Sequence, residues 1–185
     1  QKHNVSALLV ASGFQQTISG TYHRTANANL GVQAAYNYDK RYYVDFSGAV
    51  VHSAKLAPGH RNAFSPSVTL GWKIANESFL KDSDAVNDLT LSVSGSVLNQ
   101  DIDIPDYFLY APVWKTDNYG YEWNDGNLSQ YVTSTRGAND LLSFIQRKEV
   151  SANIRGAFFD NSLTFDASYF IQSMEGYTIS NTTTW

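Results

Sequence analysis

The sequence predicts an all-β protein whose long antiparallel strands form part of the wall of a transmembrane β-barrel. Three observations lead to this fold class. Apolar and polar residues alternate over long stretches, the polar positions carry few charges, and the segments between the stretches are short and long in turn. The composition agrees, because the chain is rich in Tyr, Phe and Val and such residues favour strands.

About seven stretches alternate with a period of two residues, which is the signature of a strand with two different faces. In one of them, Leu30, Val32 and Ala34 share a face opposite Gly31 and Gln33. Each stretch has roughly 9–13 residues, whereas soluble strands commonly have about 5–6 and a tilted membrane-crossing strand needs about 9–11. The expected strands are 5–14, 29–38, 42–50, 64–74, 89–97, 150–158 and 163–171.

The polar positions of these strands carry Ser, Thr, Asn, Gly and Gln, with few Lys or Glu. A soluble β-sandwich normally displays charge outward, whereas a membrane barrel turns apolar residues toward lipid and polar ones toward a lumen. The pattern favours the barrel over the sandwich. The absence of cysteine excludes disulfides and thiolate metal sites, and the net charge of −4 argues against a nucleic-acid partner.

The connections predict the orientation, because membrane barrels have short periplasmic turns and long outer loops. Segments 15–28, 52–63 and 99–147 are expected outside the cell, the last as a long extracellular loop, and 39–40, 75–88 and 160–161 on the periplasmic side. Bacterial single-chain barrels have an even number of strands. We therefore expect residues 1–185 to be a fragment of a single, larger barrel domain, completed by the remainder of the barrel.

Aromatic residues gather near the expected periplasmic ends of the strands. Tyr and Trp favour the headgroup zone of a membrane, because one end of each side chain is apolar and the other is polar. Ordinary cross-strand pairing in an antiparallel sheet gives similar clusters and is the alternative. The candidates for an aromatic girdle are Tyr36, Tyr38, Tyr42, Tyr43, Trp72 and Phe158.

Four stretches of the chain resemble the C-terminal half of the barrel of SusC/RagA-type TonB-dependent transporters. The most specific is 64–79, which resembles the family's Phe-Pro-Ser-x-x-x-Gly-Trp strand and the Asn-Glu-x-Phe turn that follows it. Segment 36–43 resembles a Tyr-x-Tyr-Asp hairpin, and 87–95 and 148–170 resemble later strands. The chain departs from the family at 49–54 and at 97–98, where the usual Arg-x-Asp-Gly-Ser-Ser and Thr-Gly residues are replaced.

This resemblance implies a barrel of about 22 strands in the outer membrane of a Gram-negative bacterium of the Bacteroidota. It implies import of glycans, oligosaccharides or oligopeptides, without enzymatic activity or a cofactor. The implied partners are a SusD-like surface lipoprotein, TonB, membrane lipid and the substrate. The family's plug domain and TonB-contacting segment have no counterpart in 1–185. A porin wall that works without TonB, or a soluble carbohydrate-binding β-sandwich, is the alternative.

The long loop at 99–147 is rich in aromatic residues, whose faces can stack on sugars. We expect these residues to contact the substrate or the lipoprotein. The alternative is that they form a small core of the loop itself. The candidates are Tyr107, Tyr110, Trp114, Tyr119, Tyr121 and Trp123.

Few other residues point to chemistry. Asp101, Asp103 and Asp106 offer oxygen ligands of the kind calcium prefers, but the glycine and the closing Glu of an EF-hand loop are missing, which favours a turn. The histidines lack metal-ligand spacing, and no catalytic or nucleotide-binding motif is present. Asp45, Arg155 and Asp166 are expected to face the lumen. Cross-strand pairing is an equal explanation of Arg155. The residues predicted to be at the surface are His3, His23, His52 and His60.

Overall fold

The computed structural model describes residues 2–17, 25–117 and 131–178. Nine strands and one short 3-10 helix, η1, form within them, and no helix of this part of the chain is long and apolar enough to cross a membrane. The elements are β1 (His3–Gln16), β2 (Thr25–Tyr38), β3 (Tyr42–Ser53), β4 (Asn62–Lys73), η1 (Ile74–Asn76), β5 (Val86–Gln100), β6 (Val113–Asp117), β7 (Tyr131–Arg136), β8 (Ile145–Phe158) and β9 (Leu163–Glu175).

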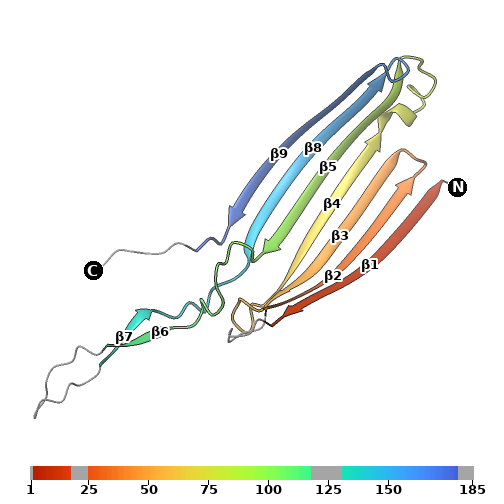
Figure 1. Cartoon of the computed structure of the whole chain (residues 1–185). Helices are drawn as coiled ribbons and strands as arrows, with labels where there is room; N and C mark the ends of the chain where they lie inside the picture. The colour runs from red at the N-terminus through yellow and green to blue at the C-terminus, as the bar shows by residue number, and fades with distance from the viewer. Residues whose placement is uncertain (1, 18–24, 118–130, 179–185) are drawn as a thin grey trace, which may run out of the picture.

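Seven strands form one curved antiparallel sheet in the order β1-β2-β3-β4-β5-β8-β9, and β6 pairs with β7 in a separate hairpin (Figure 1). Strands β1 and β9 are the two edges of the large sheet. The number of long strands, their antiparallel pairing and the order of neighbours confirm the predicted wall of a barrel. Neighbouring strands follow one another along the chain except at β5 and β8, where the hairpin is inserted.

All seven expected strands extend further at the end where the long connections lie, so that the connection expected at 15–28 is confined to 17–24 and the one at 52–63 to 54–61. The segment expected as a long loop, 99–147, contains regular structure. Residues 99–100 and 145–147 belong to the sheet, and β6 and β7 form a hairpin inside the segment. These two short strands escaped the sequence analysis because an alternating pattern of five or six residues is too short to be distinctive.

The register of the sheet places apolar side chains on one face of every strand, which we call the apolar face. Leu30 pairs with Val50, Val44 with Leu70 and Leu91 with Ile154. Half of the surface of Leu30 and 54% of that of Leu70 are exposed, and in the described part of the chain no second sheet packs on them. A soluble β-sandwich requires such a sheet, and the described residues do not form one.

The opposite side of the sheet, the polar face, carries side chains that bond to one another across strands. The Gln33 amide donates to Asp45 over 3.0 Å, and the Thr69 and Ser94 hydroxyls lie 2.8 Å apart. Asn153 donates to Asp166 over 2.6 Å. These bonds join β2 to β3, β4 to β5 and β8 to β9, so side chains of the polar face bond to each other across three pairs of neighbouring strands.

The connections lie at two opposite ends of the sheet (Figure 1). The turns after β2, β4 and β8 lie at one end, which we call the turn end. The connection at 54–61, the segment from β5 to β8 and the end of β9 lie at the other, which we call the loop end. Along the chain, the connections reach these two ends alternately, as the sequence predicted.

On the apolar face, some glycines make room for aromatic rings of the neighbouring strand. Gly156 pairs with Phe165, and a Cβ atom added to Gly156 would lie 2.4 Å from the Phe165 ring and 2.7 Å from the Phe158 ring. These two rings stack with centroids 5.9 Å apart and planes 7° apart. The missing side chain at Gly156 therefore allows the ring pair to lie flat on the sheet.

We expect Gly156→Ala to lower the free energy of unfolding by about 1–3 kcal/mol, the usual cost of forcing an extra group into a packed site. Gly95→Ala is the matched control, because Gly95 lies on the same face with nothing within 4 Å of its added Cβ atom. Urea unfolding of the complete protein in detergent micelles measures both. Equal losses in the two variants would contradict the packing described here.

Candidate functional site

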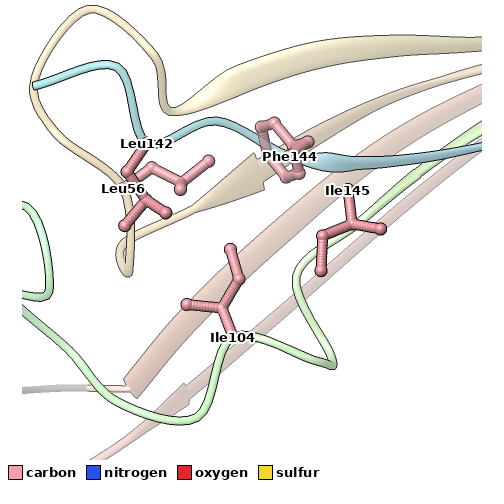
Figure 2. Packing of buried hydrophobic residues seen from close by; sticks show 5 residues of the cluster. All are labelled: Leu56, Ile104, Leu142, Phe144 and Ile145. Carbon is pink, nitrogen blue, oxygen red and sulfur yellow. The ribbon is translucent and has the colours of Figure 1, made fainter. Parts of the chain in front are cut away.

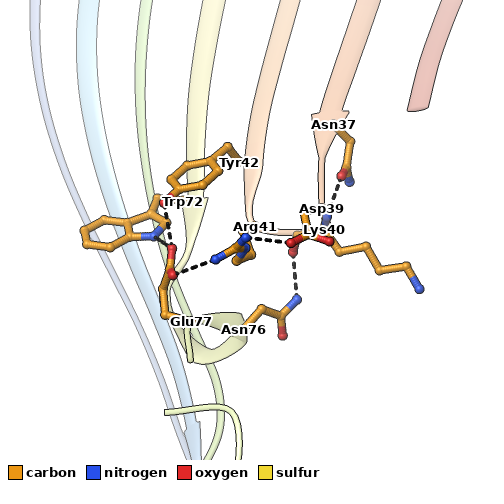
Figure 3. A network of polar contacts seen from close by, with 8 residues as sticks. All are labelled: Asn37, Asp39, Lys40, Arg41, Tyr42, Trp72, Asn76 and Glu77. Atoms are coloured by element: carbon orange, nitrogen blue, oxygen red, sulfur yellow. Dashed lines mark hydrogen bonds and ion pairs between the residues drawn. The ribbon is translucent and has the colours of Figure 1, made fainter. Parts of the chain in front are cut away.

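Glu77, which the sequence analysis did not select, is the centre of a polar network at the turn end (Figure 3). Its carboxylate accepts hydrogen bonds from the Tyr42 hydroxyl over 2.8 Å, the Trp72 indole over 3.0 Å and the Arg41 guanidinium over 3.0 Å. Only 8% of Glu77 is exposed. Because a buried charge is costly unless it is paired, this carboxylate ties together the residues that reach it.

The same network joins two successive turns. Arg41 donates a second bond to the Asp39 carboxylate over 2.6 Å, and the Asn76 amide donates to the Lys40 carbonyl over 2.7 Å. Asp39, Lys40 and Arg41 form the turn between β2 and β3, whereas Asn76 and Glu77 follow β4. The network therefore fixes neighbouring hairpins to one another.

The network accounts for the most specific part of the sequence resemblance. Segments 36–43 and 64–79 are separated along the chain. Even so, Arg41 and Tyr42 of the first and Trp72 of the second meet around Glu77 (Figure 3). Hydrogen bonds from Tyr42, Trp72 and Arg41 lower the pKa of Glu77, and bonds to Asp39 and Glu77 raise that of Arg41. The only sign of this in the sequence was the resemblance itself, because spacing does not reveal the contact.

The girdle candidates lie at the turn end, and most of them lie on the apolar face. Tyr38 pairs with Tyr42, Tyr42 pairs with Trp72, and the Tyr38 and Tyr42 rings stack 6.4 Å apart. Tyr36 lies beside them, and a 2.8 Å hydrogen bond joins its hydroxyl group to Nδ1 of the His3 imidazole. Phe158 lies farther along the same end, stacked on Phe165.

Tyr43 is the exception among these candidates. It pairs with Gly71 on the polar face, and its hydroxyl donates to the Lys40 carbonyl over 3.3 Å. The period of two residues that places Tyr42 on the apolar face necessarily turns Tyr43 to the other side. Including Tyr43 in the girdle on the basis of its position along the chain was therefore wrong.

At the loop end, a small hydrophobic cluster joins the long connections to the polar face (Figure 2). Its buried members come from the 54–61 connection, from both arms of the β5–β8 segment and from the start of β8: Leu56, Ile104, Leu142, Phe144 and Ile145. Partly buried side chains of the sheet pack against it from β3, β4 and β9: Val51, Ala63 and Met174. Leu109 and Tyr110 complete it.

The three aspartates considered as cation ligands do not converge on one point: two are bonded to other side chains, and the third is exposed. Asp101 accepts a hydrogen bond from the Ser53 hydroxyl, and Asp103 accepts one from the Gln100 amide over 2.9 Å. The Lys55 ammonium group donates to the carbonyl oxygens of Asp101 and Ile104. Asp106 is exposed. In residues 2–17, 25–117 and 131–178, no group of three or more His, Cys, Asp and Glu side chains is placed to hold a metal ion.

The loop aromatics have different surroundings. Tyr110 packs against the hydrophobic cluster, as the alternative of a loop core requires, and its ring lies 6.2 Å from that of Phe108. Tyr107 is half-buried, whereas 63% of Trp114 on the β6–β7 hairpin is exposed. Tyr119, Tyr121 and Trp123 lie outside the described residues. The loop core thus consists mainly of aliphatic side chains, and of the described candidates Trp114 is the most available for contact.

A curved antiparallel sheet with one apolar and one polar face, turns at one end and long connections at the other, is a segment of a β-barrel wall. Comparisons with known proteins agree with this class. The chain is 26% identical over 146 residues to the TonB-dependent receptor SusC of Bacteroides thetaiotaomicron. The matched region covers 78% of this chain and 14% of that protein. It is also 26% identical over 135 residues to the TonB-dependent receptor P3 of Formosa agariphila. This match covers 73% of this chain and 13% of that protein.

Solved structures have the same fold. Two structures, of the RagAB peptide transporter and of the RagAB peptide importer in a closed-closed state, superpose with a TM-score of 0.75 over 94% of this chain and 22% of theirs, at 17% and 18% identity. No protein-family model matches the sequence. The chain spans less than a quarter of the length of these relatives. The comparisons confirm that it resembles part of the barrel of a SusC/RagA-type TonB-dependent transporter.

The network predicts a pH dependence of stability. Because the pKa of Glu77 is lowered in the folded protein from its ordinary value of 4.5, its contribution to stability is complete above pH 4.5 and is lost as the pH falls through the lower folded-state value. We expect Glu77→Gln to be less stable than the parent near neutral pH and to lose less stability on acidification. Urea unfolding in detergent at several pH values measures this difference.

Asp84→Asn is the control, because Asp84 is an exposed carboxylate in the connection between η1 and β5, at the turn end. It should retain the acid sensitivity of the parent protein. Identical pH profiles for the parent and Glu77→Gln would show that the carboxylate does not hold the turns together.

Proposed function

We propose that this chain is part of the β-barrel of a TonB-dependent, SusC-like outer-membrane transporter that imports glycans, oligosaccharides or oligopeptides. The observation that carries the proposal is the apolar face, which runs uncovered across seven long strands while the other face is polar and hydrogen-bonded. Lipid on one side and a hydrated lumen on the other account for both faces. The names of the relatives, TonB-dependent receptors, support the class of transporter.

The unpaired edges of the sheet favour a larger barrel. Within lipid every backbone polar group needs a partner, so only closed barrels of strands can span a membrane. Strands β1 and β9 have 14 and 13 residues, which suits further strands on either side. We infer that the remainder of the same barrel supplies them, together with a plug domain and the segment that contacts TonB.

The two ends of the sheet fit the two sides of an outer membrane. We place the turn end on the periplasmic side, where the aromatic side chains of Tyr36, Tyr42 and Trp72 meet the headgroups. The loop end then lies outside the cell. The β6–β7 hairpin extends beyond the sheet at this end (Figure 1), and exposed Trp114 on it is available to a SusD-like lipoprotein or to the substrate.

The polar face suits the passage of hydrated solutes rather than catalysis. Two arginines on it pair with carboxylates: Arg155 with Asp166 over 2.9 Å and Arg147 with Glu149 over 3.1 Å. The Asp45 carboxylate accepts a hydrogen bond from the neutral Gln33 amide. Ser, Thr and Asn side chains lie between them. A wall of this kind bonds hydroxyl and amide groups weakly and at many points, which supports transport of polar molecules.

Substitution by arginine at the centre of β4 tests the membrane assignment. Val68 and Ser67 are adjacent but lie on the apolar and polar faces. We expect Val68→Arg to lower the free energy of unfolding in lipid vesicles by about 2–4 kcal/mol, the cost of a lipid-facing arginine near the bilayer midplane. Ser67→Arg, its control, should cost far less because its charge meets water. A larger cost for Ser67→Arg would contradict the assignment of the faces.

Substitution of the loop tryptophans tests the partner. In the complete transporter, we expect Trp114→Ala combined with Trp123→Ala to weaken capture of the lipoprotein or affinity for the substrate at least about tenfold, as for buried aromatic anchors of interfaces. Phe79→Ala, at the turn end and 70% exposed, should change neither. Co-purification of the lipoprotein and substrate titration measure both effects, and unchanged values in the tryptophan variant would exclude the hairpin as a contact.

The porin alternative differs in its source of energy. Uptake by a TonB-dependent transporter stops in cells that lack TonB, whereas diffusion through a porin continues. Uptake that persists without TonB would therefore favour the porin and contradict the proposed transporter.

A further inference from the structure

We propose that residues 101–112 and 137–144 form a fixed strap across the polar face at the loop end, clipped in place by Lys55, and that this strap narrows the mouth of the passage. The inference rests on the proposed function, because the polar face borders a passage only in a closed barrel. It concerns residues outside the four stretches that carry the sequence resemblance.

The strap lies on the polar side of the sheet. Val51 of β3 and Ala63 of β4 pair with one another, and Met174 of β9 pairs with Arg147. All three belong to the polar face and pack against the hydrophobic cluster, to which the strap contributes Ile104, Leu142 and Phe144. The cluster therefore spans the inner side from β3 and β4 to β9, instead of extending away from the sheet.

Lys55 joins the 54–61 connection to the first arm of the strap. Its ammonium group donates to the carbonyl oxygen of Asp101 over 3.1 Å and to that of Ile104 over 2.7 Å. Next to it, Ser53, only 1% exposed, donates its hydroxyl to the Asp101 carboxylate. One cation thus satisfies two carbonyl groups of the turn that begins the strap, and hydrogen bonds to a charged group are among the stronger ones in proteins.

Asn99 fixes the point where the strap leaves the sheet. Pairing between β4 and β5 ends at Ser67 and Ser96, although both strands continue. Beyond that point the buried Asn99 side chain donates to the Phe64 carbonyl over 2.8 Å, and its backbone amide donates to the Ser65 hydroxyl over 3.0 Å. Side-chain bonds replace the missing backbone ladder and hold the base of the strap.

Arg136 joins the two arms of the strap beneath the β6–β7 hairpin. Its guanidinium group donates to the carbonyl oxygens of Phe108 over 2.9 Å and of Ala111 over 3.2–3.3 Å. The backbone N–H of Asn139 donates to the Tyr110 carbonyl over 2.9 Å. Because the two arms are bonded to each other and packed on the sheet, the strap has a defined position on the wall. The β6–β7 hairpin extends from this ordered segment.

Cysteine labelling of the complete barrel in its outer membrane tests whether the Lys55 hydrogen bonds hold the strap in place. The chain has no cysteine, and Leu142 is a strap residue with 4% of its surface exposed. We expect Leu142→Cys to react slowly with a water-soluble maleimide on intact cells. Adding Lys55→Met, which keeps the length of the side chain without its charge, should speed the reaction at least about tenfold.

Lys81→Met is the matched control, because Lys81 is an exposed lysine in the connection between η1 and β5, at the turn end. It should leave the labelling rate of Leu142→Cys unchanged. Rapid labelling of Leu142→Cys alone, or equal rates with and without Lys55→Met, would overturn the strap. Ser53→Ala removes only the hydroxyl bonded to Asp101 and provides the same comparison if Lys55→Met does not assemble.

Two further measurements on the same cells distinguish failure of this inference from failure of the proposed function. Membrane fractionation shows whether the protein is in the outer membrane, and the change in its gel migration on heating shows whether the barrel is folded. If the parent protein is absent from the outer membrane, the proposed function fails before the strap is tested by labelling, and the inference fails with it. If the parent is assembled there but labelling rates do not respond to Lys55→Met or Ser53→Ala, only the strap is overturned.

Discussion

The structure depends on the separation of two surfaces by a single layer of strands. Each residue faces either the apolar or the polar side, and a slip of one residue in the pairing of any strand would exchange its two faces. Cross-strand bonds such as Gln33–Asp45 and Asn153–Asp166 are possible only in the observed register. The same register keeps Leu30, Leu70 and Ile154 together on the opposite side.

Polar groups hold the connections at both ends of this layer. At the turn end, the Glu77 carboxylate joins the turns that follow β2 and β4. At the loop end, Lys55 and Asn99 hold the long segment against the sheet where regular pairing stops. A sheet without a dry centre obtains little support from apolar packing of its own, so these networks have the role that a hydrophobic core has in a soluble protein.

The sequence predicted the long strands well because both faces are patterned over many residues. It failed at the strand ends, where the contacts are tertiary: Ser53 and Ile145 are buried against the connections, so their polarity does not follow the pattern. Glu77 was missed because two of its partners, Arg41 and Tyr42, lie far away along the chain. The β6–β7 hairpin was too short to be distinguished from a loop, and Tyr43 was assigned from its neighbourhood rather than from its parity.

The barrel assignment requires lipid against one face of the sheet and water against the other. Spin labels placed singly along β9 at positions 163–171, in the complete barrel in a bilayer, distinguish the two environments. We expect molecular oxygen, which concentrates in lipid, to broaden the spectra of labels at 163, 165, 167, 169 and 171, and a water-soluble nickel chelate to broaden those of labels at the intervening positions. Equal accessibility of both faces to the chelate, or the opposite alternation, would contradict it.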